Sequence, residues 1–387
     1  MKSATTITGI EHRMISVPFH KAAEWAAGKR PGTTRLIIQV RTAEGIVGVG
    51  ETICLWEFVE PVLARTIVPL ALGQDALEIE RLCRKIEGAG YYHHQRAMVA
   101  ALGGFEMALW DLVGKRAGMP LHQLWGGAFR NPIPMIAYLQ SKNPDEVAAE
   151  AAAAVERGIG TIKVKIGMSP ETDLEIVRAA RAAAPQAKLR ADVNGAWTIG
   201  TAKRMMRQLE QYDLEFVEQP LPLDDLPGHA ALRRLFSTPI ALDESAYTIQ
   251  DVLAIVRHEA ADVILLDPHQ AGGLLRCRKA AAIAEAAGIP VTLHSGAELG
   301  VSTAAYLHLA ASLPNLMLAV DNQYDNLVDD VIDAPHRFSN GACPLPTGPG
   351  LGVTLAPEKL ERYRADRIAD PYLDPARPDW FPTKPQY

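Results

Sequence analysis

Short apolar runs, each ending on a charged or polar side chain, recur from about residue 160 to residue 321. They are TIKVK, KLRAD, LEFVE, IALD, DVILLD, PVTLH and LMLAVD, which end at Lys165, Asp192, Glu218, Asp243, Asp267, His294 and Asp321. These end positions lie 27, 26, 25, 24, 27 and 27 residues apart. One strand, one helix and two loops need such a length, so the pattern predicts consecutive βα units. Eight strands of this kind close into a barrel whose chemistry lies at the carboxyl ends of the strands.

Helical segments fill the intervals between these strands. The barrel is predicted over residues 131–325, with a first strand over 133–138 and helices over 145–157, 171–183, 201–211, 226–235, 249–257, 274–287 and 300–311. The helix over 226–235 is expected to be short. The predicted fold class is therefore α/β, a modified TIM barrel of the (β/α)7β type.

Residues 1–130 do not follow the barrel period and predict an α+β capping domain. Strands are expected over 7–17 and 35–52, the second with a hairpin turn at 43–45, and a mobile loop is expected over 20–34. Helices are expected over 58–70, 76–89 and 95–117, the last with an apolar stripe. Residues 326–387 are rich in Pro and Asp, and we expect this C-terminal segment to return and complete the cap.

Composition and charge narrow the class of protein. The chain has 387 residues, 48% hydrophobic and 22% charged, with a formal net charge of −6. This balance gives no basic surface for nucleic acid or for an anionic membrane. The N-terminus lacks the apolar core of a signal peptide, and no run is judged to reach membrane-spanning length. We therefore expect a soluble, cytoplasmic protein.

Three consecutive strands end on carboxylates and predict a metal site. Asp192, Glu218 and either Asp243 or Glu244 should converge, because the ends of neighbouring barrel strands lie about 5 Å apart. Three such carboxylates cannot all stay ionised without a counter-charge. An oxygen-rich cluster favours a hard cation, so Mg²⁺ is expected. The alternative is that each acid caps a helix or pairs with a barrel lysine.

Groups that could move protons flank this cluster. Lys163 and Lys165 alternate along one strand, so both point into the barrel, where a lysine of lowered pKa can act as a base. Alternatively, the two lysines only neutralise the acids. Asp267 and His294 end the sixth and seventh strands and suggest an Asp–His dyad. Two bases around a divalent cation imply abstraction of a proton α to a carboxylate, with a metal-stabilised enolate.

Six motifs now make a family resemblance visible: KVK at 163–165, ADVNG at 191–195, VEQP at 217–220, LDES at 242–245, DPHQAGG at 267–273 and LHS at 293–295. With them the chain resembles the enolase superfamily, in its mandelate racemase and muconate lactonizing enzyme division. The resemblance implies that Asp192, Glu218 and Asp243 are metal ligands. It also implies that Lys165 is one acid/base group and that His294, paired with Asp267, is the other.

The subgroup motifs are mixed. LDES resembles the muconate lactonizing and dipeptide epimerase branch, but that branch has a lysine where this chain has Asp267. The segments HSGAELGVSTAAYLHLAAS and AVDNQYDN resemble the glucarate dehydratase branch. The leading hypothesis is a Mg²⁺-dependent acid-sugar dehydratase that forms a 2-keto-3-deoxy acid. A racemase or epimerase, a muconate-type cycloisomerase and a catalytically idle scaffold remain alternatives.

The substrate is expected to be a small carboxylate held between the barrel and the cap. The residues predicted to bind it are Gln140, Asn194, Glu244, Asp321 and Trp25, with Trp56 as a second aromatic of the cap. Cap loops that cover active sites shape specificity, and the loop over 20–34 is expected to do so here. By the resemblance, the chain is expected to form a homo-oligomer, a dimer or an octamer.

Overall fold

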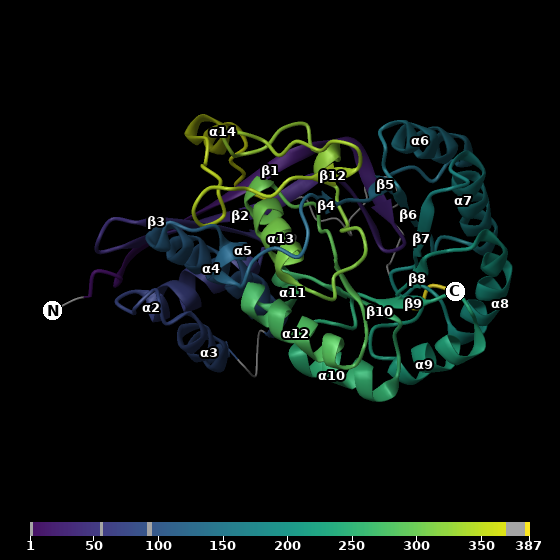
Figure 1. Ribbon diagram of the computed structural model, residues 1–387, viewed down its shortest axis with the longest axis horizontal. Helices are drawn as coiled ribbons and strands as arrows, with labels where there is room; N and C mark the ends of the chain where they lie inside the picture. Colours follow the sequence, from purple (N-terminus) through teal and green to yellow (C-terminus); the bar gives the residue numbers. More distant parts are fainter. Residues whose placement is uncertain (1–2, 55–56, 91–94, 369–383) are drawn as a thin grey trace.

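Seven parallel strands form one curved sheet at the centre of the larger part of the molecule (Figure 1). The computed structural model describes residues 3–54, 57–90, 95–368 and 384–387. The strands, in spatial and chain order, are β5 (Ala137–Leu139), β6 (Thr161–Lys165), β7 (Lys188–Asp192), β8 (Phe216–Glu218), β9 (Ile240–Leu242), β10 (Val263–Leu266) and β11 (Val291–Leu293). Each lies where an apolar run was predicted, so the α/β barrel class is confirmed.

The eighth predicted strand, ending at Asp321, is reduced to single bridges. Leu316 bridges to Val291 and Val320 bridges to Met135, both in parallel. The amide of Val320 also donates to the carbonyl of Pro134 in β4 (Ile133–Pro134), at 2.8 Å. The segment therefore joins the two edges of the sheet and closes the barrel, although its pairing is too short to form a regular ladder.

The predicted barrel helices are present and surround the sheet (Figure 1). They are α6 (Pro144–Glu156), α7 (Pro170–Ala183), α8 (Ile199–Leu209), α9 (Leu226–Leu235), α10 (Ile249–His258), α12 (Leu274–Ala286) and α13 (Gly300–Ser312). Side chains of Asn143, Ser169, Thr198 and Thr248 accept hydrogen bonds from the first turns of α6, α7, α8 and α10. These caps fix where each helix begins after its loop. Every residue of α13 is buried, since this helix lies between barrel and cap.

The cap contains a three-stranded antiparallel sheet of β1 (Ile7–Trp25), β2 (Gly28–Thr42) and β3 (Val47–Ile53). The mobile loop predicted over 20–34 is wrong, because β1 and β2 continue as a hairpin that turns at Ala26 and Ala27. Tertiary contacts override the Gly- and Lys-rich local sequence. Arg30 donates to the carbonyl of Gly296, and Thr33 donates to that of Ala297, both at 2.8 Å. The hairpin is thereby held on the loop that follows β11.

The other regular elements of the cap are helices, the longest of which packs against β2 and β3. They are α1 (Val59–Val62), the π-helical turn η1 (Leu63–Ile67), α2 (Val68–Ala71), α3 (Ile79–Gly90), α4 (Gln95–Ala117) and α5 (Leu121–Leu124). Gly48 and Gly50 of β3 let α4 approach closely, since a Cβ on either would lie 2.0 Å from a carbonyl oxygen of α4. The stretch Arg96–Ala117 is long and apolar enough to cross a membrane by composition, contrary to expectation. However, 83% of its most apolar window is buried in the protein, as in a core helix.

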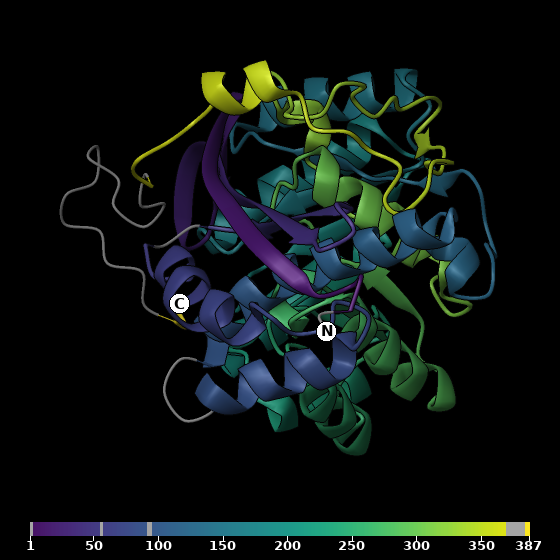
Figure 2. The same cartoon turned by 90° about the vertical axis from the view of Figure 1, so that its left-hand side faces the viewer.

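The C-terminal segment returns to the cap, as predicted, but not over its whole length. After α14 (Pro357–Arg362), Arg364 bridges to Ile15 of β1, and Figure 2 shows α14 beside one end of that strand. The strand β12 (Ala342–Cys343) pairs with β4 of the barrel instead. Residues 386 and 387 also contact the barrel, at the loop after β7. The domain boundaries at 130 and 325 stay predictions.

Candidate active site

The carboxyl ends of β6 to β9 bring the predicted charged residues to one level. In the parallel ladders, Lys165 lies opposite Asp192, and Asp192 lies opposite Glu218. Asp243 follows directly after β9. All four side chains are buried, with exposures of 6% or less. The strand register therefore places three carboxylates and an ammonium group around one point.

The two lysines are paired with these carboxylates. The Nζ of Lys163 lies 2.6 Å from Glu218, 3.2 Å from Asp192 and 2.5 Å from Asp321, and Lys165 forms an ion pair with Asp192. Burial lowers the pKa of Lys163 and of Lys165, but the neighbouring carboxylates more than offset it, so both pKa values are raised. Acids outnumber lysines around this point when no cation is bound, so a lysine pKa lowered beside a divalent cation stays a prediction.

The carboxylates differ in their protonation. Burial raises the pKa of Asp192, but Lys165 and Lys163 outweigh it and hold that pKa well below its usual range. The pKa of Glu218 is raised, first by burial and then by the charge of Asp192. A tight cluster of acids with too few cations produces this split, since one group stays ionised and its neighbour resists ionisation.

Several buried polar atoms of the cluster lack a hydrogen-bond partner. Among the residues that the structure describes, they are Glu218 Oε2, Asp243 Oδ1, Glu244 Oε2 and Asn194 Oδ1. A buried polar atom without a partner costs about 1–3 kcal/mol, so such a concentration indicates a missing binding group. Carboxylate oxygens are the donors that Mg²⁺ prefers, so the residues present fit the predicted cation.

Geometry alone groups the candidate ligands somewhat differently. Glu218, Asp243 and His294 each offer an atom within 4.8 Å of the others, whereas Asp192 contacts the lysines. We favour Asp192 over His294 as the third ligand for a hard cation, because Asp192 offers oxygen and lies in register with Glu218. The imidazole is then left for proton transfer.

His294 lies on the far side of the cluster from β6, but its partner is not the expected one. Its Nδ1 lies 2.8 Å from Asp243 Oδ2. Burial lowers the pKa of His294, but Asp243 and Asp267 raise it by more than burial lowers it, and the net result is a pKa of about 10. The imidazole is therefore positively charged at neutral pH in this arrangement.

The predicted direct Asp267–His294 dyad is not formed, since no ion pair joins the two among the described residues. Asp267 is the N-cap of the short helix α11 (Pro268–Ala271), and its Oδ1 accepts from the amide of His269 at 2.7 Å. The same oxygen accepts from the hydroxyl of Tyr306 at 2.5 Å. Burial raises the pKa of Asp267 and the charge of His294 opposes this, so that the net pKa is about 6. Asp267 thus acts on His294 through its field.

The predicted substrate-binding residues separate into two groups. Gln140 Oε1 is buried without a partner, and Asn194 donates from Nδ2 to Glu244 Oε1 at 2.8 Å. These three lie at loops above the strand ends, where a ligand can meet them. Asp321 has both oxygens in buried ion pairs, with Lys163 and with Arg190 at 3.3 Å. Its contacts are those of a structural residue.

The cap contributes groups that the sequence did not single out. Arg30, 7% exposed, reaches the carbonyl of Gly296, two residues after His294. Its guanidinium lies 5.6 Å from the ring centre of Phe19 and 6.0 Å from that of Trp25. Trp25 therefore lies near the hairpin tip, beside an arginine that contacts the loop after β11, and its contact with substrate stays a prediction. Trp56 lies outside the described residues. The position of Arg30 could not be found from a sequence interpreted there as a loop.

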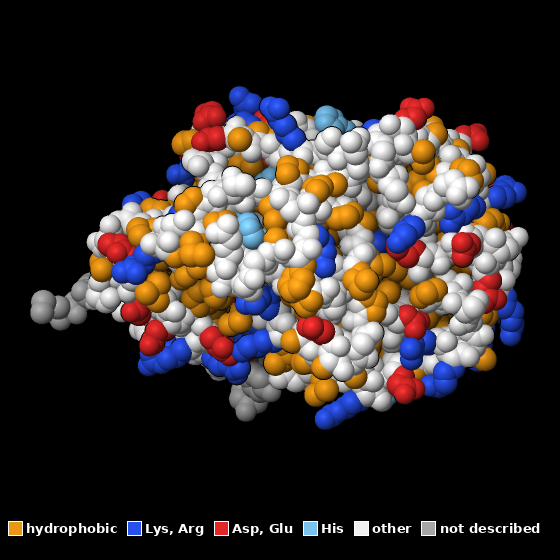
Figure 3. All heavy atoms as spheres, in the orientation of Figure 1, with side chains coloured by type: hydrophobic (Ala, Val, Ile, Leu, Met, Phe, Trp, Pro, Cys, Tyr) orange, Lys and Arg blue, Asp and Glu red, His pale blue; other side chains and the backbone are white. Residues whose placement is uncertain are grey.

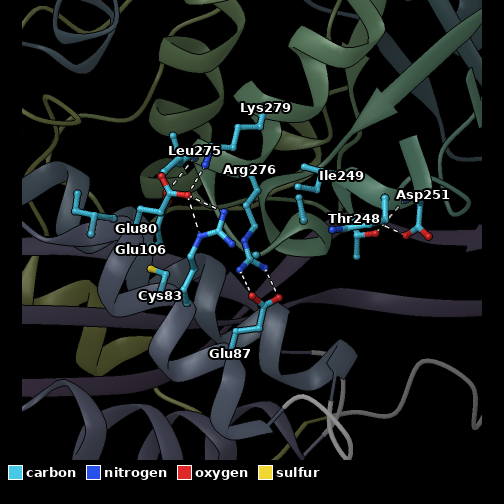
Figure 4. A pocket seen from close by; sticks show the side chains of 15 residues that line it. Glu80, Cys83, Glu87, Glu106, Thr248, Ile249, Asp251, Leu275, Arg276 and Lys279 are labelled. Atoms are coloured by element: carbon cyan, nitrogen blue, oxygen red, sulfur yellow. Dashed lines mark hydrogen bonds and ion pairs between the residues drawn. The ribbon is translucent and has the colours of Figure 1, made fainter. Parts of the chain in front are cut away.

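A separate cavity of about 470 Å³ lies between the cap helices α3 and α4 and the barrel helices α10 and α12 (Figure 4). Five of its charged side chains are paired with one another: Glu80 with Arg84 and Lys279, and Glu87 with Arg276. The pairs of Glu80 with Lys279 and of Glu87 with Arg276 join the cap to the barrel, and no residue of the carboxylate cluster lines this cavity. On the face in Figure 3, acidic and basic side chains are interspersed rather than gathered by sign.

The fold and this cluster define a barrel protein with a carboxylate-rich site under a cap. Comparison with known families agrees: residues 146–359 match the model "Enolase C-terminal domain-like". Residues 4–126 match the model "Mandelate racemase / muconate lactonizing enzyme, N-terminal domain". The chain belongs to the mandelate racemase and muconate lactonizing enzyme division of the enolase superfamily.

Individual relatives differ in the reaction that they are named for. The chain is 30% identical to a probable glucarate dehydratase of Streptomyces coelicolor, over 97% of this chain and 99% of that one. It is 32% identical to muconate cycloisomerase 1 of Rhodococcus opacus, over 92% and 98%. An enolase from Thermobispora bispora, solved with magnesium and formate, is 29% identical, with a TM-score of 0.88 over 99% and 100%. The family is an enzyme family, and relatives of similar identity are named for different reactions.

Proposed function

We propose that the protein catalyses Mg²⁺-dependent abstraction of the proton α to a carboxylate, most simply in the dehydration of an acid sugar. The observation that carries the proposal is the set of buried, unpartnered carboxylate oxygens at the strand ends, between Lys165 on β6 and His294 after β11. Buried carboxylates without partners destabilise the protein, and a bound cation would relieve this. The Lys165 ammonium and the His294 imidazole, on opposite sides of the cluster, can transfer protons.

In this proposal Asp192, Glu218 and Asp243 hold the cation. When bound, Mg²⁺ supplies positive charge beside the substrate carboxylate, which lowers the cost of forming an enolate there. The carboxylate of Asp192 would then be shared between the cation and Lys165, so its hold on the lysine proton would weaken. Lys165 becomes the better base in consequence, which the raised pKa of the chain alone does not allow.

Dehydration then needs one proton removed and one delivered. Lys165 Nζ takes the α-proton. The electron pair of the broken Cα–H bond forms the Cα–Cβ double bond as the β-hydroxyl departs. The imidazolium of His294 gives its proton to that hydroxyl, which leaves as water. The resulting enol tautomerises to a 2-keto-3-deoxy acid. Asp267, which does not hold the cation in this proposal, also raises the pKa of His294 and so favours the protonated ring that this role needs.

A racemase or epimerase is the second candidate, and the same opposed pair favours it. Two groups on opposite faces of the α-carbon can exchange its proton from either side, and no leaving group is then required. Relatives of similar identity include arabinonate dehydratase of Saccharolobus solfataricus and an N-succinyl-L-Arg/Lys racemase of Bacillus cereus. A cycloisomerase is less favoured, because β10 is followed by Asp267 instead of a lysine.

The test is incubation of the purified protein with Mg²⁺ and a panel of acid sugars, with semicarbazide detection of 2-keto acid. Keto acid that forms with Mg²⁺ and disappears with EDTA supports the dehydratase. Stereoisomers without keto acid support the racemase. Turnover that survives EDTA contradicts both. We also propose that the enzyme works in the cytoplasm. We propose further that it forms a homo-oligomer, a dimer or an octamer, and light scattering of the protein as it elutes from a size-exclusion column measures this.

A further inference from the structure

Two lysines at the mouth of the barrel form no ion pair with a carboxylate of the described residues. Lys142 lies in the loop after β5, and Lys384 lies in the short stretch 384–387 near the end of the chain. Neither takes part in an ion pair with any residue that the structure describes. Of the acids nearest Lys142, Glu24 is paired with Lys29 and Glu150 with Lys21. An unpaired ammonium group beside an enzyme site is a candidate anion binder.

The loop that carries Lys142 is held firmly in place. Leu139 of β5 lies opposite Val164 of β6, so Gln140 comes level with Lys165 and Lys142 follows two residues later. The carboxylate of Glu150 accepts from the amides of Gln140 and Ser141, at 2.8 and 3.3 Å. Because the backbone is fixed from α6, the lysine is placed above the end of β6.

The ammonium group of Lys142 has little hydrogen bonding of its own. Its Nζ donates to the carbonyl of Ser141 at 3.3 Å, and its side chain is half-buried. Burial lowers the pKa of Lys142 to about 8, and Lys165 is among the charges that act on it. It is still mostly protonated at neutral pH, so it presents a partly desolvated positive charge toward the site.

Residues 386 and 387 place Lys384 at the same mouth. The amide of Gln386 donates to the carbonyl of Ala196 at 2.7 Å, and the amide of Thr198 donates to the carbonyl of Tyr387 at 2.8 Å. The indole of Trp197 donates to the hydroxyl of Tyr387 at 2.9 Å, and that hydroxyl donates to Asp173. These contacts lie in the loop that follows β7 and at Asp173 in the first turn of α7, whose carboxylate also accepts from the amide of Gly167 in the loop after β6.

The same two residues also reach the cap. The side-chain amide of Gln386 donates to the carbonyl of Ala26 at the tip of the β1–β2 hairpin. Lys384, two residues earlier, is exposed, and Glu244, Asp192 and Lys165 are the charges that act on it. The stretch 384–387 therefore lies where hairpin, β6 loop and β7 loop meet, and it carries a positive charge to that point.

We propose that Lys142 and Lys384 together bind a second anionic group of the substrate, so that the enzyme prefers a dicarboxylate to a monocarboxylate of the same length. This deepens the proposed function and rests on it for the position of the first carboxylate. The cation site binds the reacting carboxylate, and the two lysines bind the far one. Tyr387 is a positioning residue for Lys384, since its hydroxyl fastens the stretch to Trp197 and Asp173.

The probes that test this are D-glucarate and D-gluconate, which differ only in a carboxylate or a hydroxymethyl group at C6. Calorimetric titration with Mg²⁺ gives a dissociation constant for each. The wild-type protein should bind glucarate about tenfold or more tightly, as a charge-assisted pair predicts. The ratio of the two constants should fall toward one in Lys142→Met with Lys384→Met, and should decrease in high salt. The matched control Lys85→Met, an exposed lysine of α3, should keep the wild-type ratio.

Each other outcome decides against the proposal. A wild-type protein that binds the two acids equally, or binds neither, contradicts it, as does a double variant that retains the wild-type ratio. Tyr387→Phe separates positioning from general stability, because it should reduce the glucarate preference without changing gluconate binding. The proposed function fails separately, if wild-type protein exchanges no α-proton of any carboxylate with solvent in the presence of Mg²⁺.

Discussion

Lys165 and Asp192 lie directly opposite each other in the β6–β7 ladder, and their buried side chains form an ion pair. In the proposed mechanism this carboxylate serves two partners, the ammonium group of Lys165 and the metal ion. Loss of Asp192 should therefore affect both functions together. This shared carboxylate links metal binding to the availability of the base, which is the physical centre of the proposed mechanism.

The metal ligands can be separated by two neighbouring substitutions. Asp243→Asn should weaken Mg²⁺ binding by at least about tenfold, since loss of even an outer-shell partner of a metal site typically costs that much, whereas Glu244→Gln should have a smaller effect. Asp243 offers a ligand atom within 4.8 Å of one on Glu218, whereas Glu244 Oε1 is already held by Asn194. Isothermal titration of each variant with Mg²⁺ measures this. A larger loss in Glu244→Gln would mean that Glu244 is the ligand.

Asp267 should matter less than a direct dyad partner would. Because its carboxylate is held by His269 and Tyr306 and reaches His294 only through its field, Asp267→Asn should lower kcat by about tenfold. Loss of His294 itself should cost about 10²–10⁴-fold, the usual range for an acid–base group. Steady-state kinetics of both variants decides. Equal losses in the two variants would indicate that Asp267 is a direct partner of His294. Tyr306→Phe is the control for loss of the hydrogen bond between Tyr306 and Asp267.

The regular part of this site was accessible from the sequence for a simple reason. Lys165, Asp192 and Glu218 end strands of a strict period, and parallel register then forces them to meet. What each atom touches was not accessible. The side chain of Asp267 caps α11 instead of contacting His294, and this conformation depends on the proline-containing helix start that follows it. The period shows strand ends, but it does not show the partners of a side chain.

Long-range contacts account for the other differences. The stretch expected to be a loop over 20–34 folds as a hairpin because Arg30 and Thr33 hydrogen-bond to residues 296 and 297. Lys142 follows a strand end and could have been found by the same rule as its neighbours. Lys384 could not, since its place depends on contacts between residues 386–387 and a loop about 190 positions earlier in the chain.

The hairpin tip should govern substrate affinity. Trp25→Ala removes a ring that lies beside Arg30 over the barrel, so it should raise KM several-fold with a smaller change in kcat. Trp110→Phe, in α4, is the matched control, because its ring packs against Trp125 in the cap. Kinetics with the identified substrate, together with thermal melting, measure this. A change in melting temperature alone would assign Trp25 to packing.

Glu106 predicts a pH dependence of stability that is remote from the metal site. Burial raises the pKa of Glu106 from its ordinary value of 4.5 to about 7, although the amides of Leu274 and Leu275 oppose this. The folded state thus binds the proton more tightly than the unfolded state. The stabilisation is full below pH 4.5 and is lost as the pH rises through 7, a difference of about 3 kcal/mol.

Chemical denaturation at pH 6 and pH 8 tests this. The wild-type protein should lose stability relative to Glu106→Gln as the pH rises, because the variant has no proton to lose at this position. Glu11→Gln, an exposed acid of β1, serves as the control and should follow the wild type. A constant difference between wild type and Glu106→Gln across this range would contradict the raised pKa.

The most direct test of the central claim is proton NMR of the substrate in D₂O, with Mg²⁺ and with wild-type, Lys165→Met and His294→Asn proteins. The account predicts that wild-type protein removes the α-proton and forms keto acid only with Mg²⁺. Lys165→Met should exchange no α-proton, and His294→Asn should exchange it through Lys165 while forming no keto acid. Exchange and dehydration that persist in both variants, or that need no metal, would contradict the account.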